Sequence, residues 1–148
     1  MGVTFQKVRI SNPRRPGTRA VEVEFLVDTG AIFSVVPRTL LRKLGIRPMD
    51  RQQFSLADGT KQEYPVGEAF FELGDKRATS RVVFAPPSVT PLLGAFTLES
   101  LGLMVNPVTR ELTPMQLILA RASEGARSST TVEPGTDRDR FLNSPCRL

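Results

Sequence analysis

The sequence has no histidine, no tryptophan and a single cysteine, Cys146, among its 148 residues. One cysteine cannot form an intrachain disulfide, which is typical of proteins from reducing compartments. Without histidine, neither a Ser-His-Asp nor a Cys-His catalytic arrangement can be built, and a typical zinc site is not expected. The missing residue therefore excludes two large classes of hydrolase.

Long apolar runs are also absent, since no stretch approaches the roughly 18 residues that a membrane span requires. The first residues, MGVTFQKVRI, alternate between apolar and polar side chains and lack the apolar centre of a signal peptide. We therefore expect a cytoplasmic protein without a membrane partner.

Strong clustering of charge is the third absence. The formal net charge is +5, from 20 Lys and Arg against 15 Asp and Glu. Residues 1–120 hold 15 basic and 11 acidic side chains, and residues 121–148 hold five and four. Nucleic-acid binders usually have a clustered basic patch, so no nucleic-acid partner is predicted. An electrostatic nucleic-acid binder would depend on Arg14, Arg15 and the arginines near the end of the chain.

The residues that are present favour one domain with a real core, because 40% of them are apolar. Alternating side chains predict strands at residues 3–10 and 20–27, and the Pro- and Gly-rich segment between them predicts a hairpin loop. The apolar, β-branched residues 31–37 predict a buried strand.

The rest of the pattern adds short helices and further hairpins. Pro37 and Gly45 are expected to open and end a helix, with Leu40, Leu41 and Leu44 on its apolar face. A second short helix is expected at residues 95–102. Hairpins are predicted at Asp58-Gly59, within residues 67–87 and at Asn106-Pro107.

The predicted domain covers residues 1–120 and is mainly β, with one or two short helices. Residues 121–148 differ in composition, because they are rich in Ser, Thr, Arg and Gly and contain few apolar residues. Such a composition cannot bury enough apolar surface to fold. We therefore expect a disordered C-terminal tail.

Residues 25–37, FLVDTGAIFSVVP, place an acidic residue between two apolar runs. A buried charge is costly unless it is paired, hydrogen-bonded or neutralised. Gly30 permits a tight turn, and the Thr29 hydroxyl can hold that turn. Asp28 would then be a firmly held carboxylate at the end of a strand, as general acid–base chemistry requires. Asp and Gly are common in structural turns too, but the flanks of this turn should both be buried.

LVDTGAIFSVVP resembles the active-site loop of retropepsin-like aspartic proteases, the family that includes the retroviral proteases and small bacterial and archaeal relatives. PLLGAFTLESLGL resembles the second signature of that family, two apolar residues and a glycine before a short helix. FSLADGTKQEYPVG lies where the family has its flap hairpin. The order of these elements also matches, over roughly residues 3–115.

The resemblance implies a single-lobe retropepsin-like acid protease barrel that acts as a homodimeric aspartic endopeptidase on peptides or proteins. The chain has one Asp-Thr-Gly, so a two-fold axis would bring Asp28 beside its copy. Two carboxylates about 3 Å apart share a proton. One would activate a water molecule while the other protonates the peptide carbonyl. No metal and no other cofactor is implied.

The resemblance also implies roles for the residues around Asp28. Thr29 would hydrogen-bond across the dimer, Gly30 would present its carbonyl to a bound peptide, and Ala31 would line the cleft. Ser34 matches a small hydroxyl residue of the family, although it could equally be a core residue bonded to the backbone.

Two further segments receive roles in the same way. Leu92, Leu93 and Gly94 would pack beneath the catalytic loop, where the two leucines could be core residues that also contact substrate. The flap tip would consist of Ala57, Asp58, Gly59 and Thr60, for which an ordinary surface hairpin is the alternative.

Three features depart from the family pattern. Ala95 follows Leu-Leu-Gly where many relatives have a polar or charged residue, Asn106-Pro107 falls where Asp is frequent, and the flap is not Gly-rich. A catalytically silent peptide-binding or dimerisation module on the same fold is therefore the alternative function. Residues 3–10 and 112–119 are the candidate interface segments. The sequence does not identify a substrate.

Overall fold

The computed structural model describes residues 4–119 of the chain. The chain divides into two units, of which the first ends at Gln116. The account below concerns this first unit, since only residues 117–119 of the second are described. The predicted tail, residues 121–148, lies outside the described residues, and the domain boundary at residue 120 stays a prediction.

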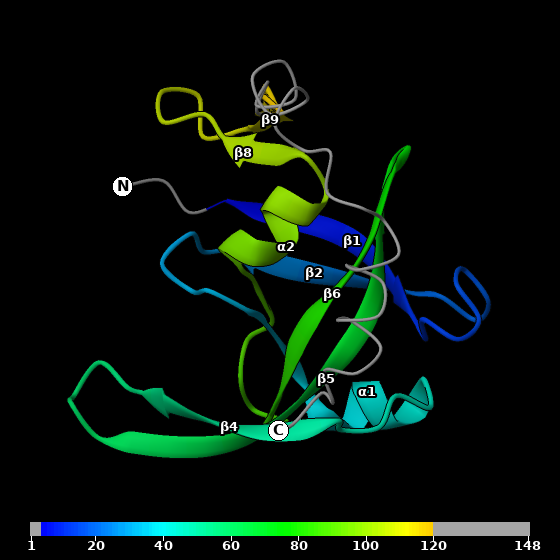
Figure 1. Ribbon diagram of the computed structural model, residues 1–148, viewed down its shortest axis with the longest axis vertical. Helices are drawn as coiled ribbons and strands as arrows, with labels where there is room; N and C mark the ends of the chain where they lie inside the picture. Colours follow the sequence, from blue (N-terminus) through cyan, green and yellow to red (C-terminus); the bar gives the residue numbers. More distant parts are fainter. Residues whose placement is uncertain (1–3, 120–148) are drawn as a thin grey trace, which may run out of the picture. The chain divides into compact units, whose positions relative to one another are not determined.

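The first unit is mainly β, as predicted. Figure 1 shows long strands with two short helices, α1 (Arg38–Lys43) and α2 (Ala95–Ser100). The strands are β1 (Phe5–Ser11), β2 (Val21–Val27), β3 (Ser34–Pro37), β4 (Asp50–Ser55), β5 (Lys61–Leu73), β6 (Lys76–Ala85), β7 (Leu92–Leu93), β8 (Leu103–Val105) and β9 (Leu112–Pro114).

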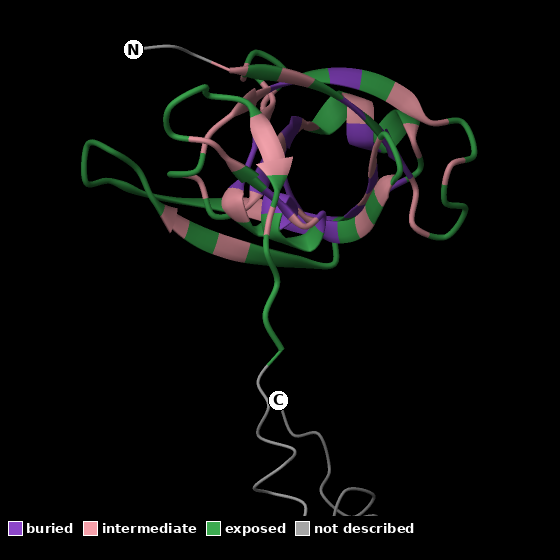
Figure 2. Cartoon of the chain, turned by 90° about the horizontal axis from the view of Figure 1, so that it is seen from above, coloured by how far each residue is buried: buried purple, intermediate pink, exposed green. Residues whose placement is uncertain are grey.

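Seven strands form one sheet in the order β1-β2-β7-β3-β6-β5-β4, and β8 pairs with β9 separately. β1 also pairs with β5, so the sheet closes on itself. Seen from above, the strands form a ring with the buried residues distributed around it (Figure 2). Closure removes β1 from the sheet edge, because it has a neighbour on both sides.

The core follows from alternation along the strands, whose inward side chains are apolar. Phe25 of β2 and Phe71 of β5 meet with ring centroids 6.1 Å apart, and both are fully buried. Other members of this core are Val8, Ile10, Val23, Val36, Leu41, Ile46, Ala69, Val82, Phe84, Leu93, Leu98, Leu101 and Leu103. The predicted alternation of residues 3–10 and 20–27 is thus confirmed by β1 and β2.

The predicted buried strand at residues 31–37 is shorter in the structure and begins at Ser34. Residues 31 and 32 use their carbonyl groups elsewhere, because Ala31 accepts a hydrogen bond from Ala95 and Ile32 accepts one from Phe96. A tertiary contact that the local pattern does not contain therefore replaces the predicted strand pairing.

The predicted first helix is confirmed with one difference at its start. Pro37 is the residue before α1 and still belongs to β3, so it does not occupy the first helical position. Gly45 follows the helix with φ of +76°, a conformation that glycine adopts without strain. Leu41 is fully buried, while Leu40 and Leu44 pack against the core from its margin.

All four predicted hairpins are present, the first of them between β1 and β2. β4 and β5 meet around Asp58-Gly59, β5 and β6 form the third hairpin, and β8 and β9 form the last one. β5 is the long strand that serves two hairpins and also pairs with β1. Neither helix within residues 4–119 is long and apolar enough to cross a membrane.

Candidate active site

Asp28 follows the last residue of β2 directly, and three backbone groups fix its position. Its own N–H donates to the carbonyl oxygen of Leu93 at 3.0 Å. The N–H of Gly30 donates to the Asp28 carboxylate at 2.9 Å, and the N–H of Ala31 donates to the Asp28 carbonyl at 3.1 Å. The Asp28 carboxylate therefore stabilises the Asp-Thr-Gly turn by accepting a backbone hydrogen bond from within it, as expected for an Asp in a tight turn.

The second motif, Leu92-Leu93-Gly94, lies beside this turn. β7 runs parallel to β2, with Leu92 beside Leu26 and Leu93 beside Val27. Leu93 is fully buried in the core, whereas Leu92 is half-buried and faces an apolar cleft. The two leucines therefore have different environments.

Gly94 lies in very close contact with the segment that follows the Asp-Thr-Gly turn. A Cβ atom at this position would lie 2.6 Å from both the carbonyl carbon and the oxygen of Phe33. Real Cβ atoms do not approach backbone so closely, and the backbone cannot yield as a flexible side chain does. A glycine is required here because it has no Cβ.

Buried hydroxyl groups tie the same elements together. The Ser34 hydroxyl accepts a hydrogen bond from the Gly94 N–H at 3.0 Å and lies 2.6 Å from the Thr97 hydroxyl. The Thr97 hydroxyl in turn lies 3.0 Å from that of Ser80. All three side chains are buried. Ser34 therefore has the environment of a core residue, and its backbone partner is Gly94 of the second motif.

The hairpin between β4 and β5 has Ala57, Asp58, Gly59 and Thr60 at its tip, where they are all exposed. The Asp58 carboxylate accepts hydrogen bonds from the Thr60 hydroxyl and N–H, at 2.6 Å and 2.9 Å. These bonds, the hydroxyl bond first, lower the pKa of Asp58. The four residues do form a hairpin tip, and their closing over a substrate stays a prediction.

An apolar cleft of about 640 Å³ lies between the Asp-Thr-Gly loop and the base of this hairpin. None of its lining residues is charged. They are Gly30, Ala31, Ile32, Phe33, Val35, Gln52, Gln53, Phe54, Ser55, Leu56, Tyr64, Val83, Ala85, Pro86, Val89 and Leu92. A concave apolar site of this size suits an extended ligand with apolar side chains.

The structure divides the predicted site residues between two cavities. Gly30, Ala31 and Leu92 line the apolar cleft. Asp28 and Thr29 line a neighbouring cavity of about 280 Å³. Its other lining residues are Thr4, Leu26, Val27, Val105 and Arg110. Asp28 thus lies at the margin of the cleft in a single chain.

An aromatic cluster that the sequence analysis did not identify forms one wall of the cleft. Phe33 meets Phe54 of β4 and Phe96 of α2 edge to face, at centroid distances of 6.3 Å and 6.0 Å. The Arg81 guanidinium lies over the Phe33 ring at 5.5 Å, and Phe54 also contacts Tyr64 at 6.1 Å. Phe33 is therefore held from three directions by residues distant in sequence.

The expectation that both flanks of Asp-Thr-Gly are buried is wrong for residues close to the turn on either side. Ile32 is 68% exposed, and Leu26 and Val27 are only half-buried. Thr29 and Gly30 are exposed as well, so within residues 4–119 the loop lies at the surface. Phe25 and Val36, at the two ends of the stretch, are buried as expected.

The described part of the chain contains no cluster of side chains typical of a metal site. No group of three or more His, Cys, Asp or Glu side chains within residues 4–119 could hold a metal ion. The described hydrogen bond of the Asp28 carboxylate comes from the Gly30 N–H.

Comparison with known proteins agrees with this geometry. The family model described as aspartyl protease matches residues 7–97. The solved EIAV protease, complexed with the inhibitor HBY-793, is 18% identical with a TM-score of 0.51, and the match covers 80% of this chain and 94% of that one. No curated protein matches the chain.

Two other solved structures are similar at lower scores. The retroviral protease-like domain of Ddi1 from Leishmania major is 16% identical with a TM-score of 0.48, covering 78% of this chain and 92% of that one. A retropepsin-like aspartic protease from Rickettsia conorii is 16% identical with a TM-score of 0.45, covering 72% and 90%.

Proposed function

Since this chain belongs to the aspartyl protease family and has a retropepsin-like fold, we propose that it is an aspartic endopeptidase that works as a homodimer. Its membership supports a protease-type function. The finer assignment depends on Asp28, which three backbone groups hold at the margin of an uncharged cleft. The fixed position of this carboxylate is the main observation that supports the proposal.

A second copy of the chain would complete the site. One chain supplies one Asp-Thr-Gly loop, and a two-fold axis beside Asp28 would place two such carboxylates together. At about 3 Å the two carboxylates cannot both ionise comfortably, so they share one proton and titrate as a pair.

The reaction then needs only these two groups and water. The ionised Asp28 accepts a proton from a water molecule, whose oxygen attacks the peptide carbonyl carbon. The protonated Asp28 of the other chain donates its proton to the carbonyl oxygen, which gives a tetrahedral intermediate. Collapse of the intermediate breaks the C–N bond, and the leaving nitrogen takes a proton from the pair.

The neighbours of Asp28 support a dimer at this position. Thr29 is exposed, and its hydroxyl makes no hydrogen bond within residues 4–119, so it is available to a partner chain. Gly30 lines the cleft, where its carbonyl would accept a hydrogen bond from a peptide N–H. Phe5, at the start of β1, is 53% exposed and belongs to the candidate interface segment 3–10.

The remaining predicted residues take supporting roles. Ala31 and Leu92 would contact substrate side chains in the cleft, while Leu93, Gly94 and Ser34 hold the loop in place. The hairpin tip would close over the substrate and exclude water. Phe54 and Leu56, which line the cleft from the hairpin, would then cover the bound peptide.

The test is cleavage of a peptide library at acidic to neutral pH by the wild type and by Asp28→Asn. We expect cleavage by the wild type and a loss of at least about a thousandfold in the variant, because the acid–base pair is removed. Sedimentation should show a dimer for both proteins. Cleavage that survives the substitution would refute the assignment. Peptide binding without cleavage, unchanged in Asp28→Asn, would instead support the silent binding module.

A further inference from the structure

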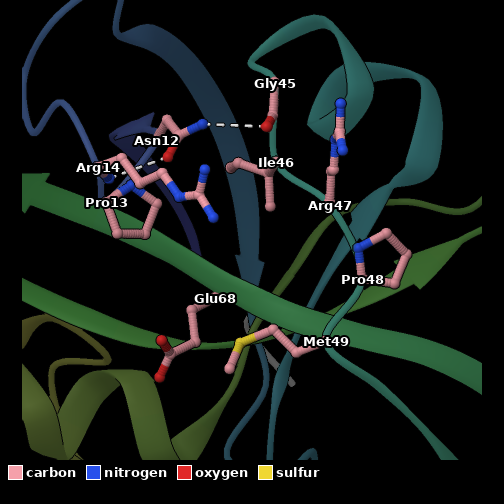
Figure 3. A pocket seen from close by; sticks show the side chains of 9 residues that line it. All are labelled: Asn12, Pro13, Arg14, Gly45, Ile46, Arg47, Pro48, Met49 and Glu68. Carbon is pink, nitrogen blue, oxygen red and sulfur yellow. Dashed lines mark hydrogen bonds between the residues drawn. The ribbon is translucent and has the colours of Figure 1, made fainter.

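Five arginines line two adjoining depressions around α1, and we propose that this surface binds an acidic segment of a partner protein. The first depression, of about 620 Å³, contains Arg14 and Arg47 (Figure 3). The second, of about 470 Å³, contains Arg38, Arg42 and Arg51, and Pro48 lines both. We call these five arginines the α1 basic surface.

Burial of the apolar residues between the arginines explains why they face outward. Leu41 and Ile46 are buried in the core, which orients α1 and the segment after it. Arg38 and Arg42 are four residues apart, so they lie on the same side of the helix. Arg47 follows Ile46 directly and is exposed.

The charges on this surface are not balanced internally. The two acidic residues among the lining are Glu63 and Glu68. Glu63 pairs with Arg51 at 2.7 Å. Figure 3 shows Glu68 on the opposite wall of the first depression from Arg14. Within residues 4–119, the other four arginines of the α1 basic surface form no ion pair.

The chemistry of the lining favours a carboxylate ligand. A guanidinium group binds a carboxylate through two parallel N–H donors, which a lysine ammonium does not do. Several arginines in two connected hollows can therefore bind a segment with several acidic side chains. Pro48 and Met49, which is 70% exposed, offer apolar contact to the rest of such a segment.

A nucleic acid fits this surface less well, because single strands bind through bases stacked on exposed aromatic rings. The aromatic residues of the second depression are Tyr64 and Phe84. Phe84 is buried, and Tyr64 is half-buried against Phe54. Neither ring of the lining is therefore fully exposed for stacking.

The α1 basic surface adjoins the cleft of the proposed active site, but the proposed binding of an acidic segment does not require catalysis. Tyr64 and Pro86 line both the second depression and the apolar cleft. An acidic segment bound around α1 would therefore lie beside the cleft, where it could hold a protein substrate near Asp28. The acidic segment is recognised on one chain, whether or not that chain cleaves it.

The experiment measures binding of a short fluorescent peptide of alternating Glu and Ser to the full chain carrying Asp28→Asn, which removes cleavage from the readout. The test variant adds Arg38→Gln, Arg42→Gln and Arg47→Gln. The matched control instead adds Arg15→Gln, Arg19→Gln and Arg77→Gln, three exposed arginines outside both depressions. Circular dichroism and thermal unfolding verify that all the chains fold.

We expect the test variant to bind the peptide roughly tenfold more weakly, because three charge-assisted contacts are lost. The control should retain the affinity within about twofold, and added salt should weaken binding in both. Equal losses in the two variants, or no binding by the parent chain, would overturn the proposal. Tighter binding of a single-stranded oligothymidylate than of the peptide would assign the surface to nucleic acid instead.

Discussion

The loop that carries Asp28 and the base of the β4–β5 hairpin border the same cleft, and the loop and the hairpin tip are held in different ways. The loop is fixed by bonds to distant elements, through Leu93, Ser34 and Gly94. The hairpin tip is exposed, and its hydrogen bonds join residues within the tip, such as Asp58 and Thr60. In the proposed protease, this difference would keep the Asp28 carboxylate in place while the hairpin tip opens and closes.

Replacing one glycine in each region with alanine should give the largest difference in stability between the two regions. Gly94→Ala places a Cβ 2.6 Å from the Phe33 backbone, so we expect a loss of about 3 kcal/mol in the free energy of unfolding. Gly59→Ala in the hairpin meets nothing within 4 Å, and its φ of +90° costs about 1 kcal/mol, confined to the tip. Urea unfolding measures the free energy of unfolding of both variants. Equal losses would show that the loop and the hairpin tip are not held differently.

Removing one buried hydroxyl should have the next largest effect. Thr97→Val leaves Ser34 and Ser80 without this partner in the core, so we expect a loss of about 2 kcal/mol. Thr60→Val, which removes an exposed hydroxyl from the tip, should leave global stability nearly unchanged. Thermal unfolding checks both, and an unchanged melting temperature for Thr97→Val would show that the buried cluster does not brace the loop.

The contact between Arg81 and Phe33 belongs to the aromatic cluster that forms one wall of the cleft. Removing this contact tests what the cluster contributes. Arg81→Met keeps most of the side-chain volume and removes the cation over the ring, so we expect about 1 kcal/mol less stability. Because Phe33 lines the cleft, KM for a peptide substrate should also rise a few-fold with little change in kcat. Arg77→Met, an exposed arginine of the same strand, is the control. A change in stability without a change in KM would limit Arg81 to a structural role.

The smallest expected effect is a pH dependence confined to the hairpin tip. The Thr60 bonds lower the pKa of Asp58 in the folded tip. They therefore stabilise the tip above the carboxyl's unfolded pKa, and this stabilisation is lost as the pH falls through the lowered folded value. Amide hydrogen exchange at Thr60 should quicken over that acidic range in the wild type. In Asp58→Asn this pH-dependent loss of protection should disappear, and if it persists another group is responsible.

Much of the fold was predictable because its signals are local. Alternation identified β1 and β2, and Asp58-Gly59 identified a hairpin. The start of β3 was not predictable, because the carbonyl groups of Ala31 and Ile32 bond to α2, which lies far along the chain. A local pattern cannot contain a partner that only folding brings near.

By itself, the sequence determined the family, the Asp-Thr-Gly turn with its supporting second motif, and the absence of any histidine chemistry. These depend on residue identity and short spacing. Tertiary structure alone decided that Thr97 and Ser80 complete the hydroxyl cluster with Ser34, and that Arg81 lies over Phe33. It also placed Ile32 at the surface instead of in the core. The reason is that burial and hydrogen-bond partners come from segments that meet only when the sheet closes.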